Sequence, residues 1–367
     1  MNSEDYLHIA FLLAKRANSK DIRPNPFVGA IVVDHNGEII GEGYHQKAGE
    51  AHAEVLAINS ALIKNSDLSN ATLYITMEPC SHTGKTPPCT NLILAHRIPK
   101  VIIGSMDPNP LVSGAKILSE AGVNVEISIQ PEIVEFNSTF NINQLNKRPK
   151  YVLKAATTIN GKIADRQGNS KWISNEKSRA YVHQILRSNA DAILTTAQTV
   201  IKDNAKMNIR VPDEDAKELN VIIIDRALAV LEAQNKNLGI FYQRNETKVY
   251  LLTDKEYTDE LPQNIEIIKA NFPEGAIDLS ELNELLLSKN ICEILVEGGG
   301  KLNATLIKQQ IADELVMFIC PSLLLDNEAI NVFNDSEFQS IENSVQLSLI
   351  NTLQFDDDLL IKYLISY

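Results

Sequence analysis

The chain has 367 residues and a formal net charge of −13, and 44% of its residues are hydrophobic and 22% charged. The length predicts two domains, and the composition is that of an ordinary globular protein. The acidic balance argues against a basic surface for nucleic acid, and no apolar run is long enough to predict a membrane span.

The cysteines and the N-terminal segment indicate the cellular compartment in which the protein is expected. The first residues lack a basic leader before their apolar part, so no secretion signal is expected. Cys80 and Cys89 are candidate metal ligands, while Cys292 and Cys320 lie in apolar, strand-like runs. This usage argues against a disulfide framework and favours a cytoplasmic protein with reduced thiols.

Residues 1–146 are predicted to form a three-layer α/β domain. Residues 5–17 are predicted to be helical, and Asn36 with Gly37 is a strong two-residue turn signal between two strands. Further helices begin near His52 and at Cys89. The predicted strands lie at residues 28–33, 38–43, 72–76, 100–104 and 123–127. Such alternation of helices and strands is typical of the α/β class.

Residues 147–367 are the second predicted domain, entered through a helical connector at 131–150. A helix is expected at 174–188, with Ser174 or Asn175 as its N-cap. Another helix is expected at 278–289. Strands are predicted from Tyr151 onward and at residues 190–196, 221–225, 249–253 and 293–296. Three strand-like runs without intervening helices close the chain, so an α/β domain ending in antiparallel strands is expected.

Three potential metal ligands stand out in the first domain: His52, Cys80 and Cys89. A zinc ion held by one imidazole and two thiolates keeps a fourth position open for water, which the metal makes acidic. Glu54 follows His52 by two residues, as in the H-x-E half of the nucleobase deaminase signature. The second half departs from that signature, because eight residues rather than two separate the cysteines.

Local structure explains how these ligands could meet. Apolar residues at helical spacing predict a helix over 52–65, with His52 and Glu54 in its first turn. Cys80 follows a short buried strand, and Cys89 opens another helix, where the helix dipole favours a thiolate. His82 could compete as a ligand, but it lies on a loop and has no acid two residues on. The alternative to a metal site is that the two cysteines and the histidine are ordinary buried residues.

The second domain holds a weaker candidate site. The glycine run at 296–301 lies between a strand and a helix, where backbone N–H groups can hold phosphate, although a packing role is about equally plausible. Trp172, the single tryptophan, is either a core anchor or the wall of a ring-binding pocket. Charged residues near strand or helix ends, each more readily explained singly as solvated, are Lys154, Arg187, Asp203 and Arg210.

Taken together, the motifs resemble the bifunctional deaminase–reductase family of riboflavin biosynthesis over nearly the whole chain. The deaminase motifs are RPNPFVGA, GEGYHQKAGEAHAE, EPCSHTGKTPPC and DPNP, and the reductase motifs are KAATTINGKIA, SKWIS, AILTTAQTV and VEGGG. The resemblance implies a cytidine-deaminase-like domain followed by a dihydrofolate-reductase-like α/β domain. It also explains the wide spacing of the cysteines, which this family shares.

The resemblance implies two consecutive reactions on a small phosphorylated pyrimidine. The first removes an amino group from a diamino-ribosylaminopyrimidinone 5′-phosphate, with His52, Cys80 and Cys89 on Zn²⁺ and Glu54 as proton shuttle. The pyrimidine would contact Asn25 and His45, and the phosphate would contact Lys85. Association into a homo-oligomer is also suggested by the family.

The second implied reaction uses NADPH to reduce the ribosyl group to a ribityl group, with Asp203 as a polar catalytic aid. The residues implied at the NADPH site are Lys154, Ala156, Trp172, Thr199, Asp203, Gly299, Gly300 and Lys301. The residues implied at the substrate are Ser170, Arg187, Met207, Arg210 and Glu297.

The chain departs from the family pattern in the reductase half. The run at 203–207 lacks the usual proline, and Arg226 stands where a cofactor-contacting serine is common. A cation at Arg226 could favour the extra phosphate of NADPH. These departures motivate one alternative, a deaminase whose second domain no longer reduces. A nucleic-acid-editing enzyme and a purely structural zinc protein are the others; the acidic charge argues against the former, and Glu54 would be unexplained in the latter.

Overall fold

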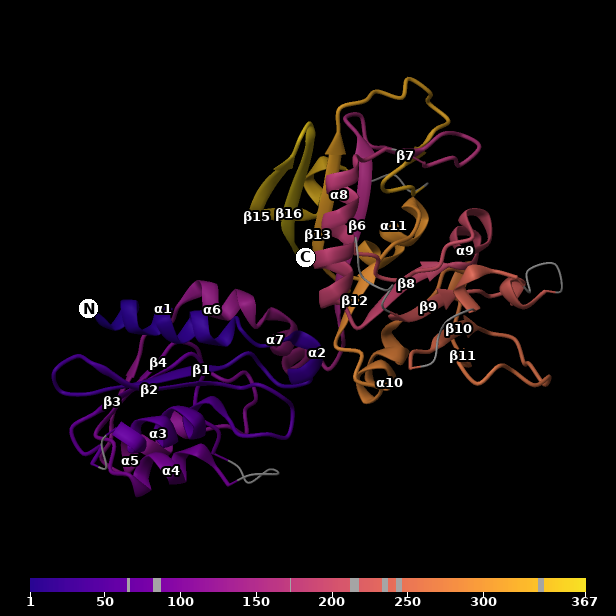
Figure 1. Cartoon of the computed structure of the whole chain (residues 1–367). Coiled ribbons are helices and arrows are strands. Elements are labelled where there is room, and N and C mark those ends of the chain that lie inside the picture. Colours follow the sequence, from indigo (N-terminus) through magenta and orange to yellow (C-terminus); the bar gives the residue numbers. More distant parts are fainter. Residues whose placement is uncertain are drawn as a thin grey trace. The chain divides into compact units, whose positions relative to one another are not determined.

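The structure, a computed structural model, describes residues 1–64, 67–81, 87–171, 173–211, 218–232, 237–241, 246–335 and 340–367. These residues form two compact units, Met1–Arg148 and Pro149–Tyr367. Each unit has its own main sheet and its own hydrophobic core (Figure 1). None of the helices in the described ranges combines the length and the hydropathy that crossing a bilayer requires.

Unit 1 contains a five-stranded sheet in the order β2-β1-β3-β4-β5. β1 is antiparallel to β2 and β3, whereas β3, β4 and β5 are parallel. Its strands are β1 (Gly29–Val33), β2 (Ile39–Tyr44), β3 (Thr72–Ile75), β4 (Lys100–Ile103) and β5 (Asn124–Ile127). Its helices are α1 (Ser3–Ala14), α2 (Ser19–Ile22), α3 (Ala53–Lys64), α4 (Cys89–Ala95), α5 (Gly114–Glu120), α6 (Pro131–Phe136) and α7 (Ser138–Asn146).

Helices cover both faces of this sheet, which confirms the predicted three-layer design (Figure 1). Side chains of a strand alternate between faces. Ala30 and Val32 therefore pack with α3, α4 and α5, while Ile31 and Val33 pack with α1 on the opposite face. Because both faces are covered, the strands are apolar on both sides.

Two glycines let the helices approach the sheet closely. A Cβ on Gly29 would lie 2.0 Å from the carbonyl oxygen of Ala10 in α1. A Cβ on Gly41 would lie 2.2 Å from the carbonyl oxygen of Ala57 in α3. Any larger residue would push a helix off the sheet. Gly29 therefore lets α1 lie close to β1, and Gly41 brings α3, which carries Glu54, close to β2.

The connection between β1 and β2 differs from the predicted two-residue turn. The ladder closes at Val33 opposite Ile39, so five residues form the loop. The Asp34 carboxylate accepts hydrogen bonds from the backbone N–H groups of Asn36 and Glu38, at 2.9 and 2.8 Å. This side-chain-to-backbone bonding, together with the positive φ of Gly37, stabilises a wider turn than the dipeptide alone indicates.

Unit 2 contains a nine-stranded sheet in the order β11-β10-β9-β8-β12-β6-β13-β16-β15. The strands are β6 (Lys150–Thr158), β7 (Lys162–Ala164), β8 (Ala192–Thr196), β9 (Asn220–Ile224), β10 (Val249–Thr253), β11 (Ile265–Lys269), β12 (Glu293–Val296), β13 (Ala312–Cys320), β14 (Ile330–Asn331), β15 (Gln346–Phe355) and β16 (Asp358–Ser366). The α-helices are α8 (Glu176–Tyr181), α9 (Ala197–Asp203), α10 (Asn283–Ser288) and α11 (Gly300–Lys308).

The strands from β11 to β13 run parallel, and β16 and β15 add to them antiparallel. The predicted α/β domain with an antiparallel end is therefore confirmed. β7 and β14 form a separate pair. Short helical turns join the elements at Ala229–Leu231, Gly239–Phe241, Pro273–Gly275, Ser280–Leu282 and Ile341–Asn343.

Two predicted helices of unit 2 are less regular than expected. The helix predicted at 174–188 consists of α8 and a π-helical stretch, η1 (Val182–Arg187). Its N-cap is Asn175, whose side chain accepts a hydrogen bond from the Ser178 backbone N–H. The helix predicted at 278–289 is a short 3₁₀ turn followed by α10. π-helical turns are rare and occur frequently at functional sites.

A buried cluster of three charges ties β6, β13 and β16 together. Glu314 lies between Lys150 and Lys362, and its side chain is 4% exposed. Its Oε2 is 2.9 Å from Lys362 Nζ. Burial alone would raise the pKa of the Glu314 carboxyl, but the two lysines hold that pKa below its usual value. Its charge therefore stabilises the fold above the unfolded-state pKa, about 4.3, and this stabilisation is lost as the pH falls further.

We expect Glu314→Gln to lower the free energy of unfolding at pH 7 by about 3–5 kcal/mol, because it removes the carboxylate that contacts the buried Lys150. Its stability should also fall less steeply than wild type below about pH 4.3. Urea unfolding followed by the fluorescence of Trp172 measures both effects. Glu266→Gln is the control, since Glu266 pairs with Lys289 near the surface. Equal acid slopes for wild type and Glu314→Gln would contradict the assignment.

Candidate active site

The structure brings His52, Cys80 and Cys89 together in unit 1. His52 immediately precedes α3, Cys80 follows the turn after β3, and Cys89 is the first residue of α4. His52 Nδ1 lies 3.6 Å from the Cys80 Sγ and 3.3 Å from the Cys89 Sγ. The three donor atoms all lie within 4.8 Å of one another. The predicted competitor His82 lies outside the described residues.

The electrostatics of these three residues suit a metal. A hydrogen bond from Cys89, followed by one from His52, lowers the pKa of Cys80 to about 4, so this side chain is a thiolate at neutral pH. The same contact raises the pKa of Cys89. One imidazole and two cysteines form a donor set used by catalytic zinc, so the residues fit Zn²⁺.

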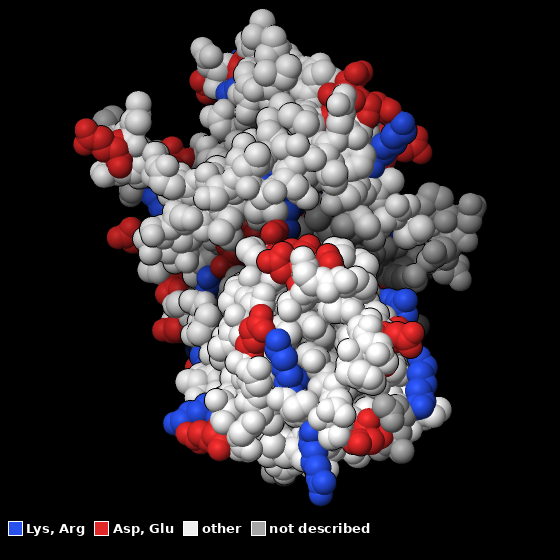
Figure 2. All heavy atoms as spheres, turned by 90° about the vertical axis from the view of Figure 1, so that its left-hand side faces the viewer, with Lys and Arg blue, Asp and Glu red and all other residues white. Residues whose placement is uncertain are grey.

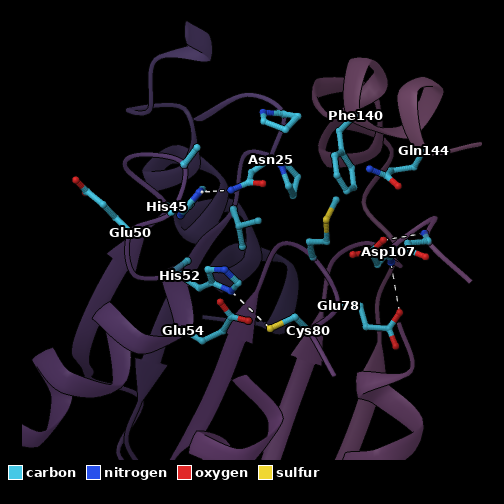
Figure 3. A pocket seen from close by; sticks show the side chains of 18 residues that line it. Asn25, His45, Glu50, His52, Glu54, Glu78, Cys80, Asp107, Phe140 and Gln144 are labelled. Atoms are coloured by element: carbon cyan, nitrogen blue, oxygen red, sulfur yellow. Dashed lines mark hydrogen bonds between the residues drawn. The ribbon is translucent and has the colours of Figure 1, made fainter. Parts of the chain in front are cut away.

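Glu54 lies beside this cluster, in the first turn of α3 (Figure 3). Its side chain is buried, with 3% of the residue exposed, and burial raises the pKa of its carboxyl. A carboxyl group with a raised pKa holds a proton more readily than an exposed one, which suits a group that takes up and passes on protons. Its position next to the three ligands agrees with the sequence prediction.

Asn25 and His45 form a pair on the other side of the cluster. His45 Nδ1 lies 3.2 Å from the Ala51 carbonyl oxygen, which can only accept, so Nδ1 carries the proton. His45 Nε2 is therefore the acceptor for Asn25 Nδ2, 3.0 Å away. This arrangement leaves the Asn25 Oδ1 as an acceptor for a ligand.

One pocket of about 450 Å³ within unit 1 is lined by Asn25, His45, His52, Glu54 and Cys80 (Figure 3). Its lining also includes residues that were not named as site residues from the sequence: Glu50, Met77, Glu78, Asp107, Asn109, Phe140 and Gln144. The DPNP motif could have indicated Asp107 and Asn109, whereas Phe140 and Gln144 carried no signal beyond their helical spacing. Lys85, predicted to contact the phosphate, lies outside the described residues.

Glu78 holds one wall of this pocket in place. Its carboxylate accepts hydrogen bonds from the backbone N–H groups of Ala115, at 3.0 Å, and Asp107, at 3.4 Å. The side chain is buried. The contacts join the turn after β3, which carries Cys80, to the loop after β4, which carries Asp107.

In unit 2 the structure joins Arg187 and Glu297, which are 110 residues apart. Arg187 Nε and Nη2 donate to the two carboxylate oxygens of Glu297 at 2.6 and 2.8 Å, and Nη1 donates to the Asn208 carbonyl oxygen at 2.6 Å. Burial would raise the pKa of Glu297, but Arg187 lowers it to about 2. Lys154 is close enough to contribute, and burial lowers the pKa of its own amine.

Arg210 contacts His183, a residue that was not singled out from the sequence. The Arg210 backbone N–H donates to His183 Nδ1 at 3.1 Å, and Arg210 Nη2 lies 3.2 Å from His183 Nε2. Burial, with the nearby charges of Arg187 and Arg210, lowers the pKa of His183 to about 4. The imidazole is therefore neutral at pH 7 and orients the loop that carries Arg210.

The other predicted reductase residues differ in their surroundings. Met207 has a positive φ of 47° and is 5% exposed in a hydrophobic core with Val200 and Ile209. Asp203 ends α9 with an exposed side chain and has no hydrogen bond or ion pair with another described residue. Ser170 is exposed, and Trp172 lies outside the described residues.

The departures at 203–207 and at Arg226 have local structural explanations. Asn204 ends α9 in the left-handed conformation that asparagine tolerates, and its side chain accepts a hydrogen bond from the Gly239 N–H at 2.7 Å. Arg226 donates to Asp254 at 2.7 Å and lies over the Phe272 ring, 5.4 Å from its centroid. The predicted cation for the extra phosphate of NADPH is thus already paired.

The start of α11 fits the phosphates of a dinucleotide. Gly299 is the N-cap of α11, and a Cβ added to this glycine would meet no other atom within 4 Å. Gly300, in contrast, packs so closely that a Cβ would lie 2.2 Å from the Asn331 carbonyl oxygen. The first N–H groups of α11 therefore lie at an open helix N-terminus, where anions are stabilised. Lys301 adds an exposed cation, while Ala156 on β6 and Thr199 on α9 are half-buried.

Comparisons with known proteins agree with both halves. The cytidine and deoxycytidylate deaminase zinc-binding region matches residues 1–105, and the RibD C-terminal domain matches residues 149–361. The riboflavin biosynthesis protein RibD of Actinobacillus pleuropneumoniae is 36% identical over 371 residues, covering 100% of this chain and 96% of that protein. The Aquifex aeolicus RibD is 36% identical, covering 98% of this chain and 97% of that protein.

The full-length fold is also similar to solved structures. A crystal structure from Thermotoga maritima, described as a diaminohydroxyphosphoribosylaminopyrimidine deaminase/5-amino-6-(5-phosphoribosylamino)uracil reductase, has a TM-score of 0.84 at 33% identity and covers 99% of both chains. Acinetobacter baumannii RibD has a TM-score of 0.80 at 27% identity, covering 100% of this chain and 99% of that one. The chain therefore belongs to the RibD family and is a zinc deaminase and NADPH-dependent reductase of riboflavin biosynthesis.

Proposed function

We propose that residues 1–146 remove an amino group from a diamino-ribosylaminopyrimidinone 5′-phosphate, and that residues 147–367 then reduce its ribosyl group to a ribityl group. The substrate follows from the two activities for which the Thermotoga relative is named. The observation that carries the first half is the convergence of His52, Cys80 and Cys89 within 4.8 Å beside the buried Glu54.

In the deaminase, His52, Cys80 and Cys89 hold the zinc ion. A zinc ion bound there would lower the pKa of a water ligand and so supply a hydroxide nucleophile near neutral pH. Glu54 would take up one proton from the attacking water and deliver it to the ring nitrogen. It would then take the proton of the newly added hydroxyl group and pass it to the departing amine, which leaves as ammonia.

The rest of the deaminase pocket binds and orients the substrate. The Asn25 Oδ1, freed by the contact with His45, accepts from the pyrimidine, and Lys85 binds the phosphate. A sheltered pocket keeps the proton transfers within the protein, because Glu54 is only 3% exposed.

In the reductase, NADPH supplies a hydride to C1′ of the opened ribose. Its site is formed by Lys154, Ala156, Trp172, Thr199, Asp203, Gly299, Gly300 and Lys301. The substrate is bound by Ser170, Arg187, Met207, Arg210 and Glu297. The bidentate Arg187–Glu297 pair presents a fixed charge pattern for substrate hydroxyl groups. Asp203 is the polar catalytic aid.

We also propose a cytoplasmic homo-oligomer that binds no nucleic acid. The four cysteines are unbridged, as a reducing compartment requires. Leu347, Leu349 and Leu353 are exposed on the edge strand β15, a surface that suits association. Among the described side chains drawn in Figure 2, acidic and basic groups are interspersed and form no continuous basic surface on that face.

A deaminase with an inactive second domain is the competing function, motivated by the run at 203–207. The buried Arg187–Glu297 pair and the open start of α11 favour a working reductase instead.

A coupled assay tests the proposal. Zinc-loaded protein is given the aminated pyrimidine ribosyl phosphate with NADPH, and ammonia and NADPH are followed together. We expect equal amounts of ammonia released and NADPH consumed. Chelation of zinc should abolish both signals, because reduction needs the deaminated product, and NADPH consumption should return when deaminated substrate is supplied. Ammonia without NADPH consumption would support the deaminase-only function. Neither signal with zinc present would contradict the substrate.

A further inference from the structure

We propose that α7, the last helix of unit 1, is a specificity element of the deaminase: Phe140 and Gln144 bind the ribosyl phosphate arm of the substrate. This inference rests on the proposed substrate. It concerns residues that neither the zinc motif nor the pyrimidine-binding pair includes, and it assigns them positioning of the substrate rather than chemistry.

Both side chains belong to the pocket that contains Glu54. Phe140 and Gln144 are four residues apart, so they lie on the same face of α7. Both line the pocket, and Figure 3 shows them across it from His45 and Glu50. The pyrimidine is held at the His45 end, next to the zinc ligands. The part of the substrate that extends away from the ring therefore points toward α7.

The chemistry of the two side chains suits a sugar and its linker. The Phe140 ring, with Met77, provides an apolar surface for the carbon face of the ribosyl group. The Gln144 amide has no hydrogen bond to another described residue, so its two donors and its acceptor are available for ribosyl hydroxyl groups.

The helix is attached firmly to the pyrimidine end of the pocket. Asn137, directly before α7, is 2% exposed. Its Oδ1 accepts from the Phe27 N–H at 2.8 Å, and its Nδ2 donates to the Phe27 carbonyl oxygen at 3.0 Å. Phe27 lies two residues after Asn25. The position of Phe140 is thus coupled to that of Asn25, and a rigid wall discriminates between ligands of different length.

The other end of α7 is attached as well. Asn143 Nδ2 donates to the Arg148 carbonyl oxygen at 2.8 Å, and Lys147 ends the helix with a positive φ of 54°. Hydrogen bonds at both ends hold α7 in place. Because the helix is already ordered, little conformational entropy is lost when Phe140 and Gln144 bind a ligand.

Steady-state ammonia release by the full-length, zinc-loaded protein tests this role. We expect Phe140→Ala to raise KM for the phosphoribosyl substrate by about tenfold or more, and Gln144→Ala to raise it by about fivefold. In both variants kcat should stay within about threefold of wild type, because the lost contacts bind substrate and transition state equally. Zinc content and NADPH oxidation with supplied deaminated substrate should not change.

Two further variants separate this role from a structural one. Leu145→Ala is the matched control, since Leu145 is on the same helix but 65% exposed and outside the pocket lining. Its KM should equal that of wild type. Phe140→Leu keeps an apolar side chain and should recover most of the affinity lost in Phe140→Ala.

An unchanged KM in both Phe140→Ala and Gln144→Ala would overturn the inference. If Phe140→Ala loses zinc or fails to fold, Gln144→Ala decides, because its amide makes no hydrogen bond within the described fold. Failure of the wild-type protein to release ammonia from this substrate would instead contradict the proposed function, so the two failures are distinguishable.

Discussion

Replacing Glu54 with alanine is expected to lower ammonia release by about 10²–10⁴-fold while zinc content stays at the wild-type level. Glu54 is not among the three residues whose donor atoms lie together, His52, Cys80 and Cys89. Its removal therefore leaves these three side chains in place. It is, however, the buried acid beside them, and burial raises its pKa. Ammonia release by the full-length protein and zinc analysis of the same sample measure the two effects.

The reductase provides an internal control for this variant. NADPH oxidation with supplied deaminated substrate should continue at the wild-type rate in Glu54→Ala. Glu42→Ala replaces an exposed glutamate on β2 of the same unit and should change neither activity. A joint loss of both activities in Glu54→Ala would show that the two sites are not independent. Retained ammonia release would show that Glu54 is not the proton shuttle of the deaminase.

Replacing Arg187 with alanine is expected to abolish reduction and to destabilise unit 2. Glu297 would become a buried carboxylate without its bidentate partner, which costs about 3–5 kcal/mol of unfolding free energy. Loss of the fixed charge pattern should lower NADPH oxidation by on the order of a hundredfold or more. Ammonia release should persist. Urea unfolding followed by Trp172 fluorescence, together with the coupled assay, measures these outcomes.

The pH dependence of the Arg187→Ala variant follows from the pKa of Glu297. In wild type this pKa is about 2, below the usual 4.5, so the pair contributes stability above about pH 4.5. That contribution is lost as the pH falls toward 2. The variant lacks the arginine that lowers the pKa, so its stability should depend less on pH over this range.

Two further variants separate the structural contribution of the pair from its role in reduction. The double variant Arg187→Met with Glu297→Leu removes both charges, so most of the stability should return while reduction stays absent. Arg166→Ala breaks the exposed pair with Asp326 and should leave reduction unchanged. Recovery of reduction in the double variant would mean that the pair only supports the fold.

Sequence alone was sufficient to predict the convergence of His52, Cys80 and Cys89 and most elements of unit 1. His52 and Cys89 lie at the starts of α3 and α4, and Cys80 follows β3, as predicted. These predictions hold because helix starts and short buried strands are encoded by the periodicity and capping of neighbouring residues. The five-residue loop between β1 and β2 was missed, because Asp34 hydrogen bonds compete with the dipeptide signal.

The residues themselves determined the order of helices and strands, the zinc motif and the acidic character of the chain, since each depends on composition or on neighbours in sequence. Only the tertiary structure decided which distant side chains meet. The pairing of Arg187 with Glu297, the contact of His183 with Arg210 and the place of Phe140 in the deaminase pocket all arise between separate elements. Sheet order and helix packing bring them together, and local sequence patterns do not encode contacts that depend on the packing of the whole domain.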